Sequence, residues 1–232
     1  MSRDRDPSET GRAIIFDLDG TLIDTYDTHR DAWRDTCREA GIDLTDEMFA
    51  WSFGRSNPTI IERLWSDAGR SRPSAEELER IAERKEDDFR RALLRDRPVM
   101  PGVPEFCRRM LDRGWSLGIG TSAPRGNLDA ALGILEIGDA ITAAATGDEL
   151  TRGKPDPEVF QLVATRLGVP PHRCIVVEDA PAGVDAALAA GMTAIGIAST
   201  GRTRGELSHA SVVVDSFEEI DDPTLDNLVP PV

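Results

Sequence analysis

Two aspartates that lie two residues apart, Asp17 and Asp19, follow directly on a short apolar run from Ala13 to Phe16. Such a run predicts a buried strand, and the ligands of open α/β sheets collect at the carboxyl ends of the strands. Two carboxylates this close repel each other unless a cation lies between them or one of them holds a proton. A hard divalent ion such as Mg²⁺ would relieve the repulsion, and the pair could then act as nucleophile and proton carrier. The alternative is a surface Asp-x-Asp-Gly loop without chemistry.

The stretch from Gly120 to Ala123 follows a second predicted strand, at residues 115–121. A hydroxyl and free N–H groups at a strand end can bind phosphate oxygens without bringing charge. Taken alone, however, the stretch fits an ordinary turn from strand to helix better.

Lys154 stands between Gly153 and Pro155, just before a predicted helix, and is one of two lysines among 27 basic residues. Proline restricts the residue before it to extended geometry, which fixes where the ammonium points. An ammonium there could neutralise phosphate charge and bind the nucleophile carboxylate. The alternative is a solvated surface lysine.

Two adjacent acids, Glu178 and Asp179, end the apolar run from Cys174 to Val177. With Asp17 and the main-chain carbonyl of Asp19 they would complete a cation site. Asp179 could instead cap the next helix, but capping would explain only one of the two acids.

Taken together, these stretches resemble the four motifs of the haloacid-dehalogenase-like phosphohydrolase superfamily, in the expected order. The string from Asp17 to Thr25 has the form of the first motif, Asp-x-Asp-Gly-Thr-Leu-x-Asp-Thr, and Glu178 to Gly183 that of the fourth. The resemblance covers the chain from Ala13 to about Asp215. It implies a Mg²⁺-dependent phosphohydrolase.

The resemblance also implies a role for each residue. Asp17 would attack phosphorus and form an aspartyl-phosphate, while Asp19 would protonate the leaving alcohol and later deprotonate the attacking water. Asp17, Asp19, Glu178 and Asp179 would hold the metal. Mg²⁺, Ser122, Ala123 and Lys154 would hold the phosphate and stabilise its charge. The presence of Asp19 argues against the dehalogenase branch.

The elements that must position these residues fall into two groups. Between Thr25 and Arg95 only helical patterns occur, whereas strands and helices alternate from about residue 103 to residue 214. Alternation predicts a parallel sheet covered on both faces. We therefore expect an α/β protein with a Rossmann-like, doubly wound core, formed by residues 12–24 and 95–232, and a small inserted all-helical cap at residues 25–94.

The cap should influence which phosphorylated molecule the enzyme uses as its substrate. It resembles the cap of the subgroup that contains β-phosphoglucomutase and many sugar-phosphate phosphatases. In the mutase, cationic cap residues hold a second phosphate. Thr25, His29 and Lys85 match the hinge and cap residues of that enzyme, although plain cap surface is an alternative for His29 and Lys85.

The cap loop departs from the mutase pattern. Phe53 and Asn57 stand where the pattern has lysine and arginine, and Arg55 is a cation at a shifted position that could equally be plain surface. We therefore expect hydrolysis of a small phosphomonoester, such as a sugar phosphate. The alternatives are isomerisation of the β-phosphoglucomutase type and, more remotely, a non-catalytic interaction module that keeps the fold.

Composition limits the partners. The formal net charge is −15, which disfavours nucleic acid and anionic membranes and leaves a small phosphorylated molecule as the expected partner. The three cysteines are far apart and predict neither a disulfide framework nor a zinc site. The charged start and the lack of a long apolar run predict a cytoplasmic protein. We expect a monomer, because cap and core must open and close.

Overall fold

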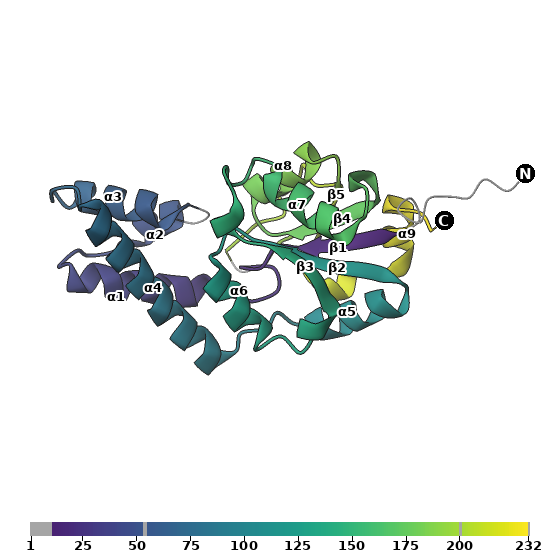
Figure 1. Ribbon diagram of the computed structural model, residues 1–232, viewed down its shortest axis with the longest axis horizontal. Helices are drawn as coiled ribbons and strands as arrows, with labels where there is room; N and C mark the ends of the chain where they lie inside the picture. Colours follow the sequence, from purple (N-terminus) through teal and green to yellow (C-terminus); the bar gives the residue numbers. More distant parts are fainter. Residues whose placement is uncertain (1–10, 53–54, 200, 232) are drawn as a thin grey trace, which may run out of the picture. The chain divides into compact units, whose positions relative to one another are not determined.

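The computed structural model describes residues 11–52, 55–199 and 201–231, which form two compact units (Figure 1). The sheet unit contains the residues before Thr25 and those from Pro98 onward, and the helical unit contains Thr25–Arg97. The second boundary lies three residues beyond the expected one because the last helix of the insert continues to Asp96. Arg97 then ends that helix in the left-handed conformation, with φ of 47°.

The sheet unit is built on six parallel strands in the order β3-β2-β1-β4-β5-β6. The strand of the first motif, β1, therefore lies at the centre, between the strands that precede the second and fourth motifs. The strands are β1 (Arg12–Phe16), β2 (Trp115–Gly120), β3 (Ile141–Ala145), β4 (Cys174–Glu178), β5 (Thr193–Ile197) and β6 (Val212–Val214). Apolar runs on β1 and β4 are almost fully buried, as expected of central parallel strands.

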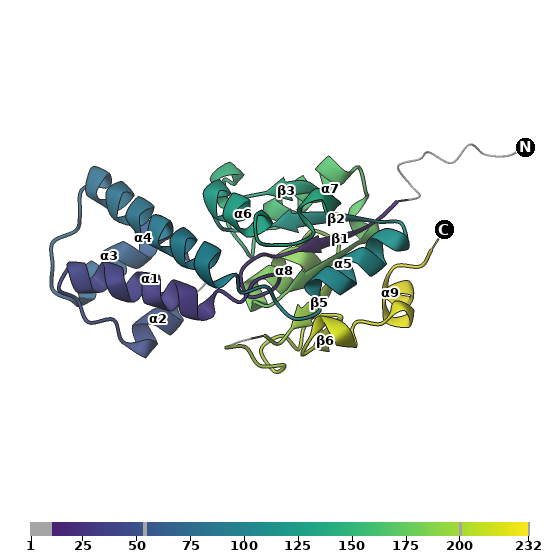
Figure 2. The ribbon, with the colours of Figure 1, turned by 90° about the horizontal axis from the view of Figure 1, so that it is seen from below.

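Helices cover both faces of this sheet, with α7 and α8 on one face and α5 and α6 on the other (Figures 1 and 2). Alternate residues of β1 point to opposite faces: Ala13 and Ile15 belong to a core cluster with residues of α7 and α8, whereas the Phe16 ring lies 6.1 Å from that of Phe106 on α5. The predicted doubly wound α/β fold is confirmed. The helices are α5 (Val103–Asp112), α6 (Arg125–Leu132), α7 (Glu158–Leu167), α8 (Pro181–Ala189) and α9 (Asp222–Leu228).

The helical unit contains α1 (Tyr26–Glu39), α2 (Asp46–Ser52), α3 (Asn57–Asp67) and α4 (Ala75–Asp96). Its apolar core includes Trp33, Phe49, Ile61 and Leu64. A capping box begins α4, as the Ser-x-x-Glu spacing of Ser74 and Glu77 in the sequence predicts. Ser74 Oγ accepts the N–H of Glu77, and the Glu77 carboxylate accepts the N–H of Ser74.

Two short helices were not predicted from the sequence, α2 in the helical unit and α9 at the end of the chain. Each has seven residues, about two turns, which is too short for a helical period to stand out. Asp221 caps α9 by accepting the N–H of Thr224 at 2.8 Å.

Candidate active site

The first and fourth motifs meet at one edge of the sheet. Strands β1 and β4 are parallel neighbours, with Phe16 opposite Val177. The Asp17 N–H extends this pairing by donating to the Val177 carbonyl at 3.0 Å. Because both strands end here, the carboxylates of Asp17, Glu178 and Asp179 converge.

Lys154 reaches this group of carboxylates from the segment before α7. Its Nζ lies 2.5 Å from Asp17 Oδ1 and 2.6 Å from Glu178 Oε1. The Lys154 side chain is only 9% exposed, and its ammonium lies 4.9 Å from the centre of the Phe160 ring. The residue is therefore a buried cation that binds two acids, and not a solvated surface lysine.

The three carboxylates could hold a metal ion. Ligand atoms from Asp17, Glu178 and Asp179 all lie within 4.8 Å of one another, and the three residues are 6%, 1% and 3% exposed. Carboxylate oxygens are the ligands that Mg²⁺ prefers. This donor set therefore fits a hard divalent cation.

The pKa values of the charged groups at this edge of the sheet also favour a bound cation. Burial raises the pKa of Asp17 well above its ordinary value. Burial and then the charge of Glu178 raise the pKa of Asp179 to about 8. Burial lowers the pKa of Lys154, but Asp17 and Glu178 outweigh it and raise that pKa above the ordinary value. Lys154 is thus charged, and it does not suffice to keep both Asp17 and Asp179 ionised without a further cation.

Two glycines of the motifs make room for the carboxylates. A Cβ on Gly20, which has φ of +85°, would lie 2.5 Å from Asp179 Oδ2. A Cβ on Gly183 would lie 1.7 Å from Glu178 Oε1. Glu178 is further fixed because its Oε2 accepts the Ala180 N–H at 2.6 Å. Any side chain at either glycine would displace a candidate metal ligand.

Asp19, Ser122 and Ala123 lie in loops of the same unit. Asp19 is half-buried in the turn after β1, where its backbone forms an isolated β-bridge with that of Ile23. Ser122 is exposed in the loop that follows β2. The Ala123 N–H donates to Thr121 Oγ1 at 3.0 Å, so a phosphate bound there would have to replace this bond.

Arg202 also belongs to this region and was missed in the sequence analysis. Its Nε lies 3.7 Å from Asp179 Oδ2, and its side chain is 20% exposed. It follows β5, which pairs with β4. No motif marks this position, and one more arginine in an arginine-rich chain gives no signal.

The helical unit holds a second polar group, which contains three of the residues predicted there. Thr25 is buried, and its carbonyl accepts the His29 N–H at 2.8 Å. Lys85 is 2% exposed; its Nζ lies 3.0 Å from His29 Nδ1 and 2.9 Å from Glu86 Oε1. Asn57 Nδ2 donates to the same Glu86 oxygen at 2.8 Å. Lys85 is therefore interior, and Glu86 offsets its charge.

Arg55 contacts Trp51 within the helical unit. It is exposed, its Nη1 donates to the Trp51 carbonyl at 2.7 Å, and its guanidinium lies 4.5 Å from the centre of the Trp51 ring. Phe53, the other loop position singled out in the sequence, lies outside the described residues.

Residues 12–191 match the family model of haloacid dehalogenase-like hydrolases, which covers both the motifs and the insert. The chain belongs to this family. Membership confirms the resemblance read from the sequence. None of the helices that the structure describes has the length and apolar composition needed to cross a membrane.

Relatives within the family share most of the chain. Validoxylamine A 7'-phosphate phosphatase of Streptomyces hygroscopicus subsp. limoneus is 31% identical over 90% of this chain and 95% of its own length. Fructose-1-phosphate phosphatase YqaB of Escherichia coli is 35% identical over 79% of this chain and 95% of its own. The crystal structure of β-phosphoglucomutase from Clostridium difficile superposes with a TM-score of 0.83 at 28% identity, covering 94% of this chain and 96% of that one.

Proposed function

We propose that the protein is a Mg²⁺-dependent phosphohydrolase that acts on a small phosphomonoester, such as a sugar phosphate, through an aspartyl-phosphate. The observation that carries this proposal is Lys154 between Asp17 and Glu178, at 2.5 and 2.6 Å, with Asp179 beside them. Two related proteins named as phosphatases of phosphorylated small molecules support the choice of substrate class.

In the first half of the proposed reaction, an Asp17 oxygen attacks the substrate phosphorus. The bond between phosphorus and the alcohol oxygen breaks, and Asp19 donates a proton to that oxygen. In the second half, Asp19 takes a proton from water, the water oxygen attacks phosphorus, and the bond to Asp17 breaks. Inorganic phosphate leaves, and both aspartates return to their starting states.

The remaining residues would bind the phosphoryl group or the metal ion and stabilise the charge of the reacting group. Lys154 orients Asp17 and neutralises the transferring phosphoryl group, while Ser122 and the Ala123 N–H would hold its oxygens. Asp17, Glu178, Asp179 and the main chain of Asp19 would hold Mg²⁺. Bound there, Mg²⁺ supplies positive charge for the phosphoryl oxygens.

A phosphoryl-transfer isomerase of the β-phosphoglucomutase type is the second candidate. It is favoured by the likeness to the β-phosphoglucomutase structure and by the match of His29 and Lys85. The buried Glu86, which lies 2.9 Å from Lys85 Nζ, weighs against it because it offsets the charge that a second phosphate would need. Hydrolysis is therefore the first choice.

We further propose that the enzyme works as a cytoplasmic monomer, with the helical unit acting as its cap domain. The net charge of −15 supports a partner that is neither nucleic acid nor anionic membrane. Size-exclusion chromatography with light scattering would test the monomer, since a mass near 25.3 kDa is expected.

Phosphate release from a panel of sugar phosphates and other small phosphomonoesters, with Mg²⁺ or with EDTA, tests the proposal. The panel includes β-glucose 1-phosphate with a trace of its bisphosphate, with glucose 6-phosphate followed in parallel. Mg²⁺-dependent phosphate release is expected. Formation of glucose 6-phosphate without phosphate release would establish the isomerase instead.

A further inference from the structure

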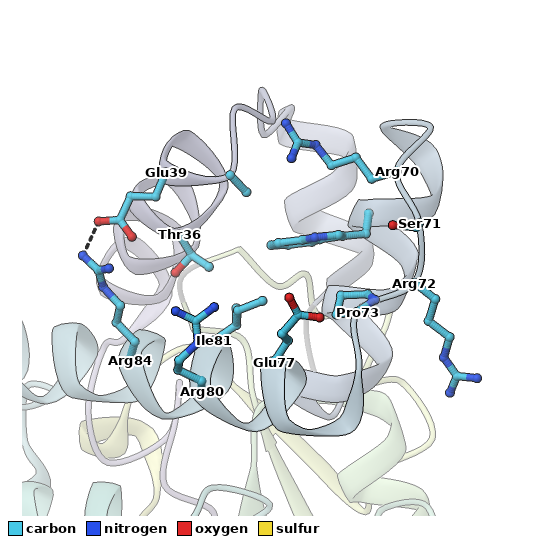
Figure 3. Close-up of a pocket in the computed structure, with 12 residues that line it drawn as sticks. Thr36, Glu39, Arg70, Ser71, Arg72, Pro73, Glu77, Arg80, Ile81 and Arg84 are labelled. Carbon is cyan, nitrogen blue, oxygen red and sulfur yellow. Dashed lines mark hydrogen bonds and ion pairs between the residues drawn. The ribbon is translucent and has the colours of Figure 1, made fainter.

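A groove on the helical unit, separate from the polar group around Lys85, has a volume of about 720 Å³ (Figure 3). It is formed by the last turn of α1, the loop from α3 to α4, and the first turns of α4. Its apolar lining includes Trp65 and Ile81, which are partly buried against the core of the unit. The volume is sufficient for a small organic molecule.

The polar lining of the groove is rich in arginine. Arg70, Arg72, Arg80 and Arg84 line it, against two acids, Glu39 and Glu77. The formal charge of the lining is therefore positive, although the whole chain carries −15. Such local positive charge on an acidic protein favours an anionic ligand.

The two acids are already engaged by other groups. Glu39 pairs with Arg84, as Figure 3 shows, and the Glu77 carboxylate accepts the Ser74 N–H at 2.9 Å in the capping box. Glu39 is therefore already paired, whereas the hydrogen bonds with Ser74 and, to a smaller extent, the charge of Arg80 lower the pKa of Glu77. Arg72 is engaged too, because its Nη2 lies 2.5 Å from Glu62 Oε1, and it points away from the groove in Figure 3.

Arg70 and Arg80 differ from most other arginines of this unit. Arg34 and Arg63, for example, pair with acids three or four residues away, at 3.2 and 2.6 Å. The same local pairing occurs at Arg30, Arg38, Arg90 and Arg91, and Arg95 pairs with the adjacent Asp96. Among the residues that the structure describes, no ion pair is found for Arg70 or Arg80. Two guanidinium groups are thus left to bind a ligand in the groove.

We propose that this groove binds a nucleoside monophosphate, with Arg70 and Arg80 on the phosphate and the base against Trp65. A guanidinium group can donate two hydrogen bonds to a phosphate, and a flat ring stacks well on an indole. The site would be distinct from the acids around Lys154, and its occupation does not depend on the proposed phosphatase activity.

Isothermal titration calorimetry with AMP, adenosine and inorganic phosphate tests this proposal on the full chain in EDTA. Phosphate release is measured in the same samples, so that consumption of AMP would be seen. We expect AMP to bind with a dissociation constant of about 1 mM or lower, and adenosine and inorganic phosphate to bind more weakly. Inorganic phosphate that binds as tightly as AMP would overturn the base contact.

Arg80→Gln and Arg70→Gln should each weaken AMP binding by about tenfold, because each removes a charged hydrogen bond to the phosphate. Arg91→Gln is the matched control, since Arg91 lies on the same helix and pairs with Asp88. Asp17→Asn should bind AMP as the wild type does, which separates this site from the proposed active site. AMP binding that Arg80→Gln and Arg70→Gln leave unchanged, or no binding to the wild type, would overturn the proposal.

Discussion

The two lysines of the chain are both buried, and both lie against carboxylates, but their surroundings differ. Lys154 is bound by two acids, Asp17 and Glu178, with Asp179 next to them. Lys85 is bound by one acid, Glu86, and its other neighbours are His29 and the rings of Trp33 and Phe89.

The difference lies in the charge that is left over. Around Lys154, acids outnumber the ammonium, so carboxylate oxygens remain to bind a metal ion. Around Lys85, one carboxylate offsets one ammonium, and Asn57 takes up the same Glu86 oxygen. A buried ion pair that is complete in this way serves structure or specificity, whereas one with surplus charge is poised for chemistry.

Replacing the two lysines should therefore have unequal effects on activity. Lys154→Met should lower kcat by about 10²- to 10³-fold, because it removes a charge that stabilises the transition state. Lys85→Met should change kcat by less than about threefold at a temperature where the protein stays folded. Steady-state phosphate release measures both. An equal loss in Lys85→Met would show that the helical unit takes part in the chemistry.

Replacing Glu86 in the helical unit should lower the stability of the protein. Glu86→Leu should lower the free energy of unfolding by about 3–5 kcal/mol, because it leaves Lys85 as an uncompensated buried charge. The double variant Lys85→Met, Glu86→Leu should recover most of this loss. Urea unfolding measures both, with Glu83→Gln as an exposed control on the same helix. A double variant as unstable as the single one would mean that packing, and not charge, explains the loss.

Magnesium should distinguish the two lysine sites without any change to the lysines. At a hundredfold excess over its dissociation constant, Mg²⁺ should stabilise the wild type by about 2.7 kcal/mol. Glu86→Leu should gain as much from Mg²⁺ as the wild type does, and Asp179→Asn should gain less. Thermal unfolding with Mg²⁺ or EDTA reports the gain. An equal gain in Asp179→Asn would place the metal elsewhere.

The smallest expected effect belongs to Ser74, at the start of α4. Ser74→Ala should cost about 1 kcal/mol of stability, since it removes the hydroxyl that accepts the Glu77 N–H. Phosphate release should be unchanged. Urea unfolding checks the stability, and a loss of activity in the folded variant would contradict the separation of the two units' roles.

The sequence allowed the convergence of acids at Asp17 and Asp179 to be predicted because both follow apolar strands, and parallel strands end at a common edge. It also allowed the start of α4 to be predicted, because Ser74 and Glu77 form a local motif. Local patterns of this kind depend on residues close in the chain.

The partners of Lys85 and Asp179 could not be predicted in the same way. Glu86 precedes two further acids, Asp87 and Asp88, and only packing selects it to face Lys85. The contact of Arg202 with Asp179 likewise depends on how the chain returns to the sheet edge after β5. Such contacts are set by tertiary structure, and no short-range pattern records them.

The central claim is that Asp17 is the nucleophile, and phosphate release by Asp17→Asn in Mg²⁺ tests it most directly. The assay uses the best substrate of the panel, and circular dichroism confirms that the variant is folded. The account predicts no phosphate release above that of a protein-free control, because an amide does not replace the attacking carboxylate. Release at the wild-type rate would contradict the account.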